Sequence, residues 1–521
     1  MRKLLIIGID GGTLELINRF VSSGKLPFFR KIMEDGCYGE LKSTVPALTP
    51  PAWTSSFTGV NPGKHNIFDF FRFDKETKSM KIISSLERKY PSFWEILTKY
   101  GIKTGVYNIP CSYPADIVNG FMVTGMGTPS GCGGFAFPKD EEKILNEIKR
   151  KKFGANSVLL EKNRREDFLN DIYATTEIDE EIAVKLLKKY NPQVFMYVYD
   201  ESDRVMHFFW HDFDENHPKH DKETIFKDAI LNYYERMEDG IKKFLKEFGE
   251  CDLVIYSDHG FGPLYKDVYV NRLLWKWGYL KTNQYAKESA QKPLYKRILK
   301  EIIPTKMRRY YREKIKPSPL SNPLGYVDFD SSTAVYTSVS GRSIIILKEE
   351  ERERIKQELK EKLENYIDEK TGIKPFKEVF FKEEIYQGEW LSGAPDIIIE
   401  EDGRYAFKTD WSLEEIKDSS QYGAVKSGSH REKGFVFFYG NSFKKAGKIE
   451  NCQVMDICPT ILHLLKLPVG SEMDGKVIIE CLKDCGQIVA ETCSDLRSEN
   501  GKECKVDEEE IKEKLKNLGY M

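Results

Sequence analysis

The residues of this sequence that could do metal chemistry follow short apolar segments. Three aspartates and three histidines occur in the motifs "GIDGG", "DESDRVMHFFW", "SDHGFG" and "SGSHREKG": Asp10, Asp203, His207, Asp258, His259 and His430. Together they supply about the set of ligands that two divalent ions with open positions need. Oxygen and nitrogen ligands without thiolate favour zinc, manganese or iron, and the donor types do not decide among the three. We expect two divalent ions, with zinc first and manganese or iron as the alternatives.

Each of these motifs, taken alone, also has a structural explanation. Asp10 can belong to an ordinary Asp-Gly turn, and the histidine of the last motif can be a solvated loop residue. Asp203 and His207 stand four apart, so a helix would place them on one face, where they could also be a cap and a packed side chain. The adjacent Asp258 and His259 are more specific, because a turn after a strand can bring them together. The combination of all four motifs therefore indicates the metal site.

The segment "VPALTPPAWTSSFTG", residues 45–59, offers a hydroxyl for the same site. Pro50 disfavours the helical conformation at Thr49 and is itself tolerated at a first helical position, so we expect Thr49 to cap a helix. This helix would run from Pro50 through Phe57 to a stop at Gly59. As structure alone, Thr49 would be an ordinary cap at the positive end of a helix. Beside two metal ions, its hydroxyl would have a lowered pKa and would be a nucleophile at neutral pH.

Apolar segments that alternate with helical patterns must position these side chains. Four segments have the continuous apolar character of strands buried on both faces: residues 3–9, 194–199, 252–257 and 434–440. Amphipathic stretches at 91–101 and 456–467 are typical of helices. The alternation predicts an α/β layered protein, in which ligands bind beyond the carboxyl ends of the strands.

The amino-acid composition changes between about residues 276 and 415. This part begins with a segment that is rich in lysine and arginine and is interrupted by prolines. The segment "STAVYTSVSGRSIIIL" follows, and it predicts strands of a separate unit. We therefore expect four parts: a first part of the catalytic core at 1–275, an inserted cap at 276–415, a last part of the core at 416–480, and a C-terminal tail with a surface helix at 481–521.

The composition excludes several classes of protein. With 521 residues the chain exceeds the usual domain size of about 100–200 residues and can bury a large core. Its 80 basic and 82 acidic residues nearly cancel, so no global charge favours nucleic acid as a partner. No apolar stretch reaches the length of about 18 residues that a membrane span needs, and the first one is too short for a signal peptide. Ten cysteines are too sparse for a disulfide scaffold, which favours the cytoplasm.

In these motifs the sequence resembles the type I phosphodiesterase/nucleotide pyrophosphatase branch of the alkaline phosphatase superfamily. The motifs follow the family's order over roughly residues 1–282 and 416–480. The resemblance implies an alkaline-phosphatase-like α/β/α core with a mostly parallel sheet and an inserted cap. It also implies one metal on Asp10, Thr49, Asp258 and His259, and the other on Asp203, His207 and His430.

The sequence departs from the family where substrate is recognised. Well-studied nucleotide pyrophosphatases continue the nucleophile motif with Pro-Asn-His and carry a phosphate-binding asparagine further on, whereas this chain has Pro51-Ala52-Trp53 and Phe70. The sulfatase nucleophile motif is missing around Cys111. Phosphomutases of the superfamily usually have serine in place of the threonine.

We therefore expect a two-metal hydrolase of phosphodiester or pyrophosphate bonds that acts through a phosphothreonine on Thr49. One alternative is a phosphomonoesterase or phosphotransferase (mutase) on the same centre, and another is a catalytically silent, metal-stabilised binding protein. The substrate would be a phosphate ester, with nucleotides, sugar nucleotides and lipid-linked compounds all open. No nucleic-acid partner is expected.

Three further cationic features have two interpretations each. Residues 292–316 contain ten basic and two acidic side chains, which is typical of a solvated helical face and would also suit a lid that attracts a polyanionic or membrane-surface substrate. Arg204 and Arg431 neighbour the proposed ligands, where they could contact phosphate or form structural ion pairs.

Overall fold

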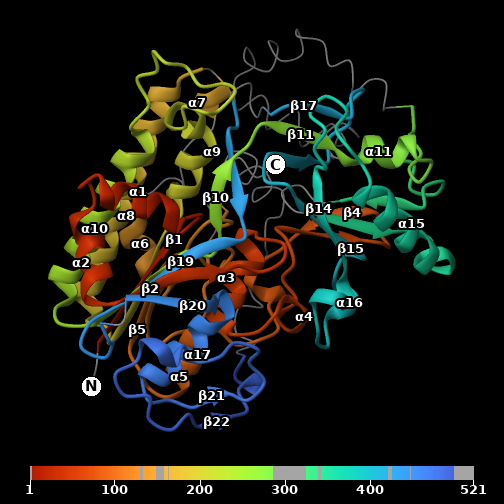
Figure 1. Ribbon diagram of the computed structural model, residues 1–521. Helices are drawn as coiled ribbons and strands as arrows, with labels where there is room; N and C mark the ends of the chain where they lie inside the picture. Colours follow the sequence, from red (N-terminus) through yellow and green to blue (C-terminus); the bar gives the residue numbers. More distant parts are fainter. Residues whose placement is uncertain are drawn as a thin grey trace.

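The computed structural model describes residues 3–129, 133–147, 158–161, 163–284, 324–337, 342–419, 425–445 and 447–497 (Figure 1). The basic segment 292–316 and the expected C-terminal surface helix lie outside these ranges. What the sequence predicts for these two segments therefore stays a prediction.

A nine-stranded sheet forms the centre of the protein, in the order β20-β2-β19-β9-β1-β8-β5-β6-β7. Its middle strands run parallel to one another: β9 (Asp252–Tyr256), β1 (Leu4–Ile9), β8 (Val194–Tyr199), β5 (Thr104–Ile109) and β6 (Gly120–Thr124). Antiparallel β19 (Lys433–Tyr439) joins β9 to β2 (Cys37–Lys42), while β20 (Gly447–Gln453) and β7 (Ala136–Phe137) form the edges. The four predicted buried strands and the mostly parallel sheet are confirmed.

Alternate residues of the central strands pack into two separate cores. In β1, Leu5, Ile7 and Ile9 belong to one core, and Leu4 and Ile6 belong to the other, as the period of two in a strand requires. The first core is covered by α1 (Leu14–Ser22), α2 (Pro27–Asp35), α8 (Arg165–Tyr190), α9 (Glu201–Phe213) and α10 (Ala229–Phe248) (Figure 1). The second is covered by α3 (Thr49–Thr58), α5 (Phe93–Lys99) and α17 (Ile457–Leu464). This is the predicted α/β/α layering.

Two of the smaller sheets have more than two strands. Antiparallel β12 (Ala334–Tyr336), β13 (Ser343–Ile346), β15 (Ile397–Glu401) and β14 (Phe376–Phe381) form the first, against which α15 (Arg352–Glu364) packs. The second contains β16 (Tyr405–Lys408), β11 (Lys266–Tyr269) and β17 (Ile416–Asp418). The strands expected in "STAVYTSVSGRSIIIL" are β12 and β13. The division of the chain at residues 275, 415 and 480 stays a prediction.

Helix α3 begins one residue earlier than predicted. Its N-cap is Leu48, and Thr49 is the first helical residue. Because Pro50 and Pro51 have no N–H, the first amide that can close a helical turn is that of Ala52, which donates to Leu48 O at 3.0 Å. The prediction that Thr49 itself is the cap is therefore wrong by one position. The predicted stop is confirmed, since the C-cap Gly59 adopts a left-handed φ of 76°.

The same helix is docked tightly on the central sheet. The Trp53 ring is fully buried and lies against Gly8 of β1, where an added Cβ would overlap the indole. A residue with a side chain at position 8 would push the helix away, so glycine permits this close approach. Thr49, one turn before Trp53, is thereby held at the carboxyl end of β1.

Candidate metal centre

The structure brings all seven predicted side chains together where β1, β8 and β9 end. They are Asp10 after β1, Thr49 at the start of α3, Asp203 and His207 on α9 after β8, Asp258 and His259 after β9, and His430 on β18 (Gly428–Arg431). None of the seven is more than 7% exposed. β18 reaches this place because it pairs with β10 (Gly260–Pro263), which directly follows His259.

The first group of ligand atoms surrounds His259. Its Nε2 lies 3.3 Å from Asp10 Oδ1 and 3.4 Å from Asp258 Oδ2. Thr49 Oγ1 lies 3.4 Å from the same nitrogen. The ligand atoms of Asp10, Asp258 and His259 all lie within 4.8 Å of one another, which is close enough for a single ion to contact them.

Each of the two carboxylates in this group has one oxygen that the protein holds and one that faces the centre. Trp53 Nε1 donates to Asp10 Oδ2 at 3.2 Å, and the Gly11 amide donates to Asp258 Oδ1 at 3.3 Å. The other oxygens, Asp10 Oδ1 and Asp258 Oδ2, have no regular hydrogen bond to any residue that the structure describes. Buried carboxylate oxygens without a donor are costly unless a cation completes their shell, so these two fit a metal ion.

The second group surrounds Asp203. Its Oδ2 lies 3.3 Å from His207 Nε2, and its Oδ1 lies 3.1 Å from His430 Nε2. The two histidine nitrogens are 3.2 Å apart. The His430 ring stacks on that of His259 with a centroid distance of 3.9 Å, so the two groups share one buried chamber.

The orientation of all three imidazoles is fixed by backbone carbonyls. Nδ1 of His207 bonds Gly428 O at 2.7 Å, Nδ1 of His259 bonds Gly260 O at 3.0 Å, and Nδ1 of His430 bonds Ala47 O at 3.2 Å. Because a carbonyl oxygen can only accept, each Nδ1 must carry the proton. All three Nε2 atoms are therefore directed at the carboxylates, in the arrangement that metal-binding histidines use.

The charges in the chamber attract a cation. Burial raises the pKa of Asp10 to about 6 and the pKa of Asp258 well above its usual value. Burial alone would lower the pKa of His259, but the carboxylates of Asp258 and Asp10 more than offset it and raise this pKa to about 9. Burial and the neighbouring charge of His259 lower the pKa of His430 to about 3, so its Nε2 has a lone pair at neutral pH. The donor set thus fits divalent ions that accept nitrogen and oxygen.

Two serines that position the ligands were not predicted. Ser202 Oγ donates to Asp10 O at 2.7 Å. Ser257 Oγ donates to His259 O at 2.6 Å and accepts the Gly12 amide at 2.7 Å. In the sequence both serines directly precede an aspartate of the site, and this repeated Ser-Asp pair is the signal that could have revealed them.

Arg204 forms the structural ion pairs that were one of the two interpretations, whereas Arg431 donates to backbone carbonyl groups instead. Arg204 is 1% exposed and pairs with Glu201 on its own helix, with Asp200 Oδ2 at 3.9 Å. Arg431 donates to backbone carbonyl oxygens of four residues: Ser429, His430, Pro263 and Gly403.

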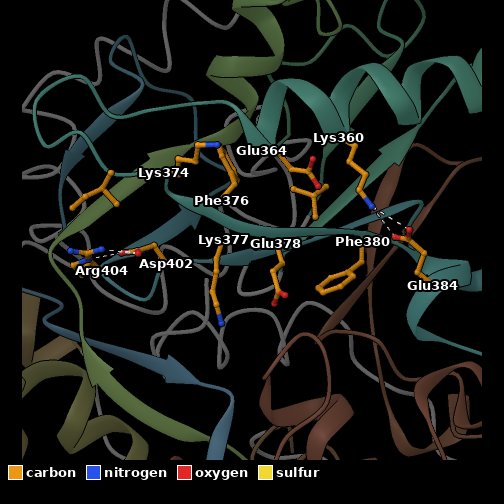
Figure 2. A pocket seen from close by; sticks show the side chains of 12 residues that line it. Lys360, Glu364, Lys374, Phe376, Lys377, Glu378, Phe380, Glu384, Asp402 and Arg404 are labelled. Atoms are coloured by element: carbon orange, nitrogen blue, oxygen red, sulfur yellow. Dashed lines mark hydrogen bonds and ion pairs between the residues drawn. The ribbon is translucent and has the colours of Figure 1, made fainter.

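A pocket of about 860 Å³ lies over β14 and α15 (Figure 2). Its charged side chains have both signs, and Lys360 pairs with Glu384, as Arg404 does with Asp402. None of the seven predicted site residues lines it. We therefore identify the candidate centre by its converging donor atoms and not by this pocket.

Known proteins share this sequence pattern and this fold. A family model described as type I phosphodiesterase / nucleotide pyrophosphatase matches residues 4–430. Phosphonoacetate hydrolase from Sinorhizobium meliloti 1021 superimposes with a TM-score of 0.55 at 13% identity, covering 88% of this chain and 94% of that chain. Human ectonucleotide pyrophosphatase / phosphodiesterase 5 gives a TM-score of 0.51 at 12% identity, covering 93% and 100%. At such low identity, the structural similarity shows the fold alone.

Proposed function

Since this chain belongs to the type I phosphodiesterase/nucleotide pyrophosphatase family and is a phosphoric ester hydrolase, we propose that it hydrolyses phosphodiester or pyrophosphate bonds with Thr49 as the nucleophile. The observation that carries the proposal is the convergence of three imidazole Nε2 atoms and three carboxylates beside the buried Thr49 hydroxyl. Such a set suits two divalent ions, for which we propose zinc, with manganese or iron as the alternatives.

The two groups of ligand atoms would divide between the two ions. Asp10, Thr49, Asp258 and His259 would hold one, and Asp203, His207 and His430 would hold the other. Support comes from the inward-facing oxygens and from the carbonyl bonds that fix each imidazole. When bound, the ions would lower the pKa of the Thr49 hydroxyl and stabilise charge on the phosphoryl oxygens.

Thr49 would act by covalent catalysis. A bond from Thr49 Oγ1 to phosphorus forms as the bond from phosphorus to the leaving oxygen breaks, the hydroxyl proton passes to the leaving oxygen, and the result is a phosphothreonine. A water oxygen then replaces Oγ1 on phosphorus, and the hydroxyl is restored with one proton from that water. Because Thr49 stands at the first position of α3, the positive end of the helix also favours the anionic phosphoryl group.

A phosphomonoesterase or phosphotransferase on the same centre is the second candidate. Phe70 favours this candidate. Relatives have a phosphate-binding asparagine at this position, but here the side chain is 2% exposed and packs in the hydrophobic core.

We expect kcat/KM for bis(4-nitrophenyl) phosphate to exceed that for 4-nitrophenyl phosphate by at least about tenfold. A preference for the monoester would establish the second candidate. Hydrolysis of neither ester, nor of a wider panel of phosphate esters, by the metal-loaded protein would favour the silent binding protein.

Metal affinity should fall as the pH is lowered, most steeply below about pH 6. The pKa of Asp10 in the folded protein is raised to about 6, so its carboxyl takes up a proton below that pH. A metal ion needs the carboxylate, so each proton that it must displace weakens binding by about tenfold per pH unit. Competition with a fluorescent chelator between pH 5 and pH 8 measures this slope. The proton on His259, whose pKa is about 9, sets a slope across the whole range, so a slope that does not steepen below about pH 6 would remove Asp10 from the proposed ligands.

The proposal also covers the chemical class of the substrate and the cellular location of the protein. A nucleotide, a sugar nucleotide or a lipid-linked phosphate ester would suit the chemistry, with no role for nucleic acid. Across the described residues, no helix combines the length and apolar character that spanning a membrane requires. We propose a cytoplasmic location on the sparse cysteines of the sequence.

A further inference from the structure

Tyr386 connects the part of the chain expected as a cap to the loop before Thr49. It directly follows α16 (Lys382–Ile385), and its hydroxyl donates to Val45 O at 2.6 Å, four residues before Thr49. The side chain is buried, with 5% of the residue exposed, and its ring packs on that of Phe68 at a centroid distance of 5.4 Å. Because burial raises the pKa of Tyr386, the hydroxyl keeps its proton and stays a donor.

The same segment also contacts the chain after α3. The Gln387 amide donates to Asn61 Oδ1 at 3.2 Å, and the Trp390 amide donates to Gly63 O at 2.9 Å. Residues 386–390 therefore hold the connections on both sides of the helix that carries the proposed nucleophile.

The loop that Tyr386 contacts, residues 45–48, supports two parts of the candidate site. Ala47 O accepts the bond from His430 Nδ1 at 3.2 Å, and Leu48 is the N-cap of the helix whose first residue is Thr49. A shift of this loop would move the imidazole and the nucleophilic hydroxyl together. Misplacing a reacting group by about 1 Å can lower a rate by about 10²-fold, so the position of the loop matters for catalysis.

We propose that Tyr386 is a positioning residue for the hydrolysis: through Val45 O, its hydroxyl fixes the loop that places Thr49 and His430. The inference rests on the proposed function, since it takes Thr49 as the nucleophile. Tyr386 is not among the seven proposed site residues, and its role requires no contact with substrate. The rate of attack on phosphorus would thus depend on a contact between the expected cap and the core.

The test compares two variants that each lose one buried tyrosine hydroxyl. Tyr386→Phe removes the bond to Val45 O and keeps the ring. Tyr326→Phe is the matched control, because Tyr326 also lies in the expected cap, is 3% exposed and donates to a backbone carbonyl, Thr409 O, at 2.5 Å. With bis(4-nitrophenyl) phosphate, we expect Tyr386→Phe to lower kcat at least about fivefold while KM changes less than about twofold. Tyr326→Phe should change neither constant.

Amide hydrogen exchange measures the loop without catalysis. The Ala52 amide donates to Leu48 O at 3.0 Å, so its protection reports on the position of the loop. Mass spectrometry of fragments that cover residues 45–53 should show exchange at least about fivefold faster in Tyr386→Phe than in the wild type. The exchange in Tyr326→Phe should equal that of the wild type.

A kcat of Tyr386→Phe within about twofold of the wild type would overturn the inference, and so would an equal fall in Tyr326→Phe, which would mean a general loss of stability. A higher KM with unchanged kcat would overturn it as well, because Tyr386 would then contact substrate. Hydrolysis by the wild type tests the proposed function separately. If the wild type hydrolyses no phosphate ester, the hydrolase proposal fails, whereas equal hydrogen exchange in Tyr386→Phe and the wild type refutes the hold of Tyr386 on the loop.

Discussion

Replacing Thr49 with alanine is expected to lower kcat for phosphate ester hydrolysis by about 10³-fold or more. The substitution removes the hydroxyl that lies 3.4 Å from His259 Nε2, while the six aspartate and histidine side chains keep their positions. Metal content, measured by mass spectrometry of the purified protein, should therefore stay near two ions, and the melting temperature should change little. Rapid-quench labelling with a radioactive phosphate ester should detect a phosphothreonine in the wild type and none in the variant.

Thr49→Ser is the matched control, because serine keeps a hydroxyl at the same helical position. It should retain most of the activity that alanine loses. If Thr49→Ala hydrolyses esters at a rate close to that of the wild type, the nucleophile is a water molecule and the covalent mechanism is wrong.

Replacing His259 with alanine should remove metal and activity together. Its ligand atom lies close to those of Asp10 and Asp258 in the first group, and also close to those of Asp203 and His430 in the second. Its loss leaves the buried carboxylates of Asp10 and Asp258 without their nearest positive partner. We expect the metal content to fall below two ions and kcat/KM to fall by about 10²-fold or more.

His463→Ala controls for the loss of an imidazole elsewhere. His463 lies on α17 and bonds Cys485 O at 2.6 Å, and it is not among the seven proposed site residues. Its replacement should leave metal content unchanged. A His259→Ala protein that still holds two ions with wild-type affinity would refute the ligand assignment, and Asp203→Asn provides an independent check on the second group.

The strands that hold the site were predictable because their signal is local. β1, β8 and β9 are continuous apolar segments, and such segments are strands buried on both faces when helices cover a parallel sheet. The candidate ligands follow from the same rule, since polar residues beyond the carboxyl ends of neighbouring parallel strands must meet. Asp203 and His207 could be paired in advance because a helix fixes their spacing.

Other features depend on contacts that no local pattern encodes. The Nδ1 partner of His430 is Ala47 O, which is 383 residues away in the chain. The predicted start of α3 is one residue too late. The prediction rests on the preference of Pro50 for an extended residue before it, whereas the helix is set by its first available amide, that of Ala52, which donates to Leu48 O.

The position of β19 between β2 and β9 has a consequence for the nascent chain. β2 ends at Lys42 and its neighbour β19 begins at Lys433, so about 390 residues must leave the ribosome before the two can pair, which takes about 20–80 s at usual rates of synthesis. From the synthesis of β9, which ends at Tyr256, until β19 emerges, β9 presents an open apolar edge, which is prone to pairing with other chains. His430 emerges just before β19, so the candidate metal centre receives its last ligand in the same late step in which β19 joins β2 to β9. We therefore expect this protein to need chaperone protection in this interval and to take up metal only after it.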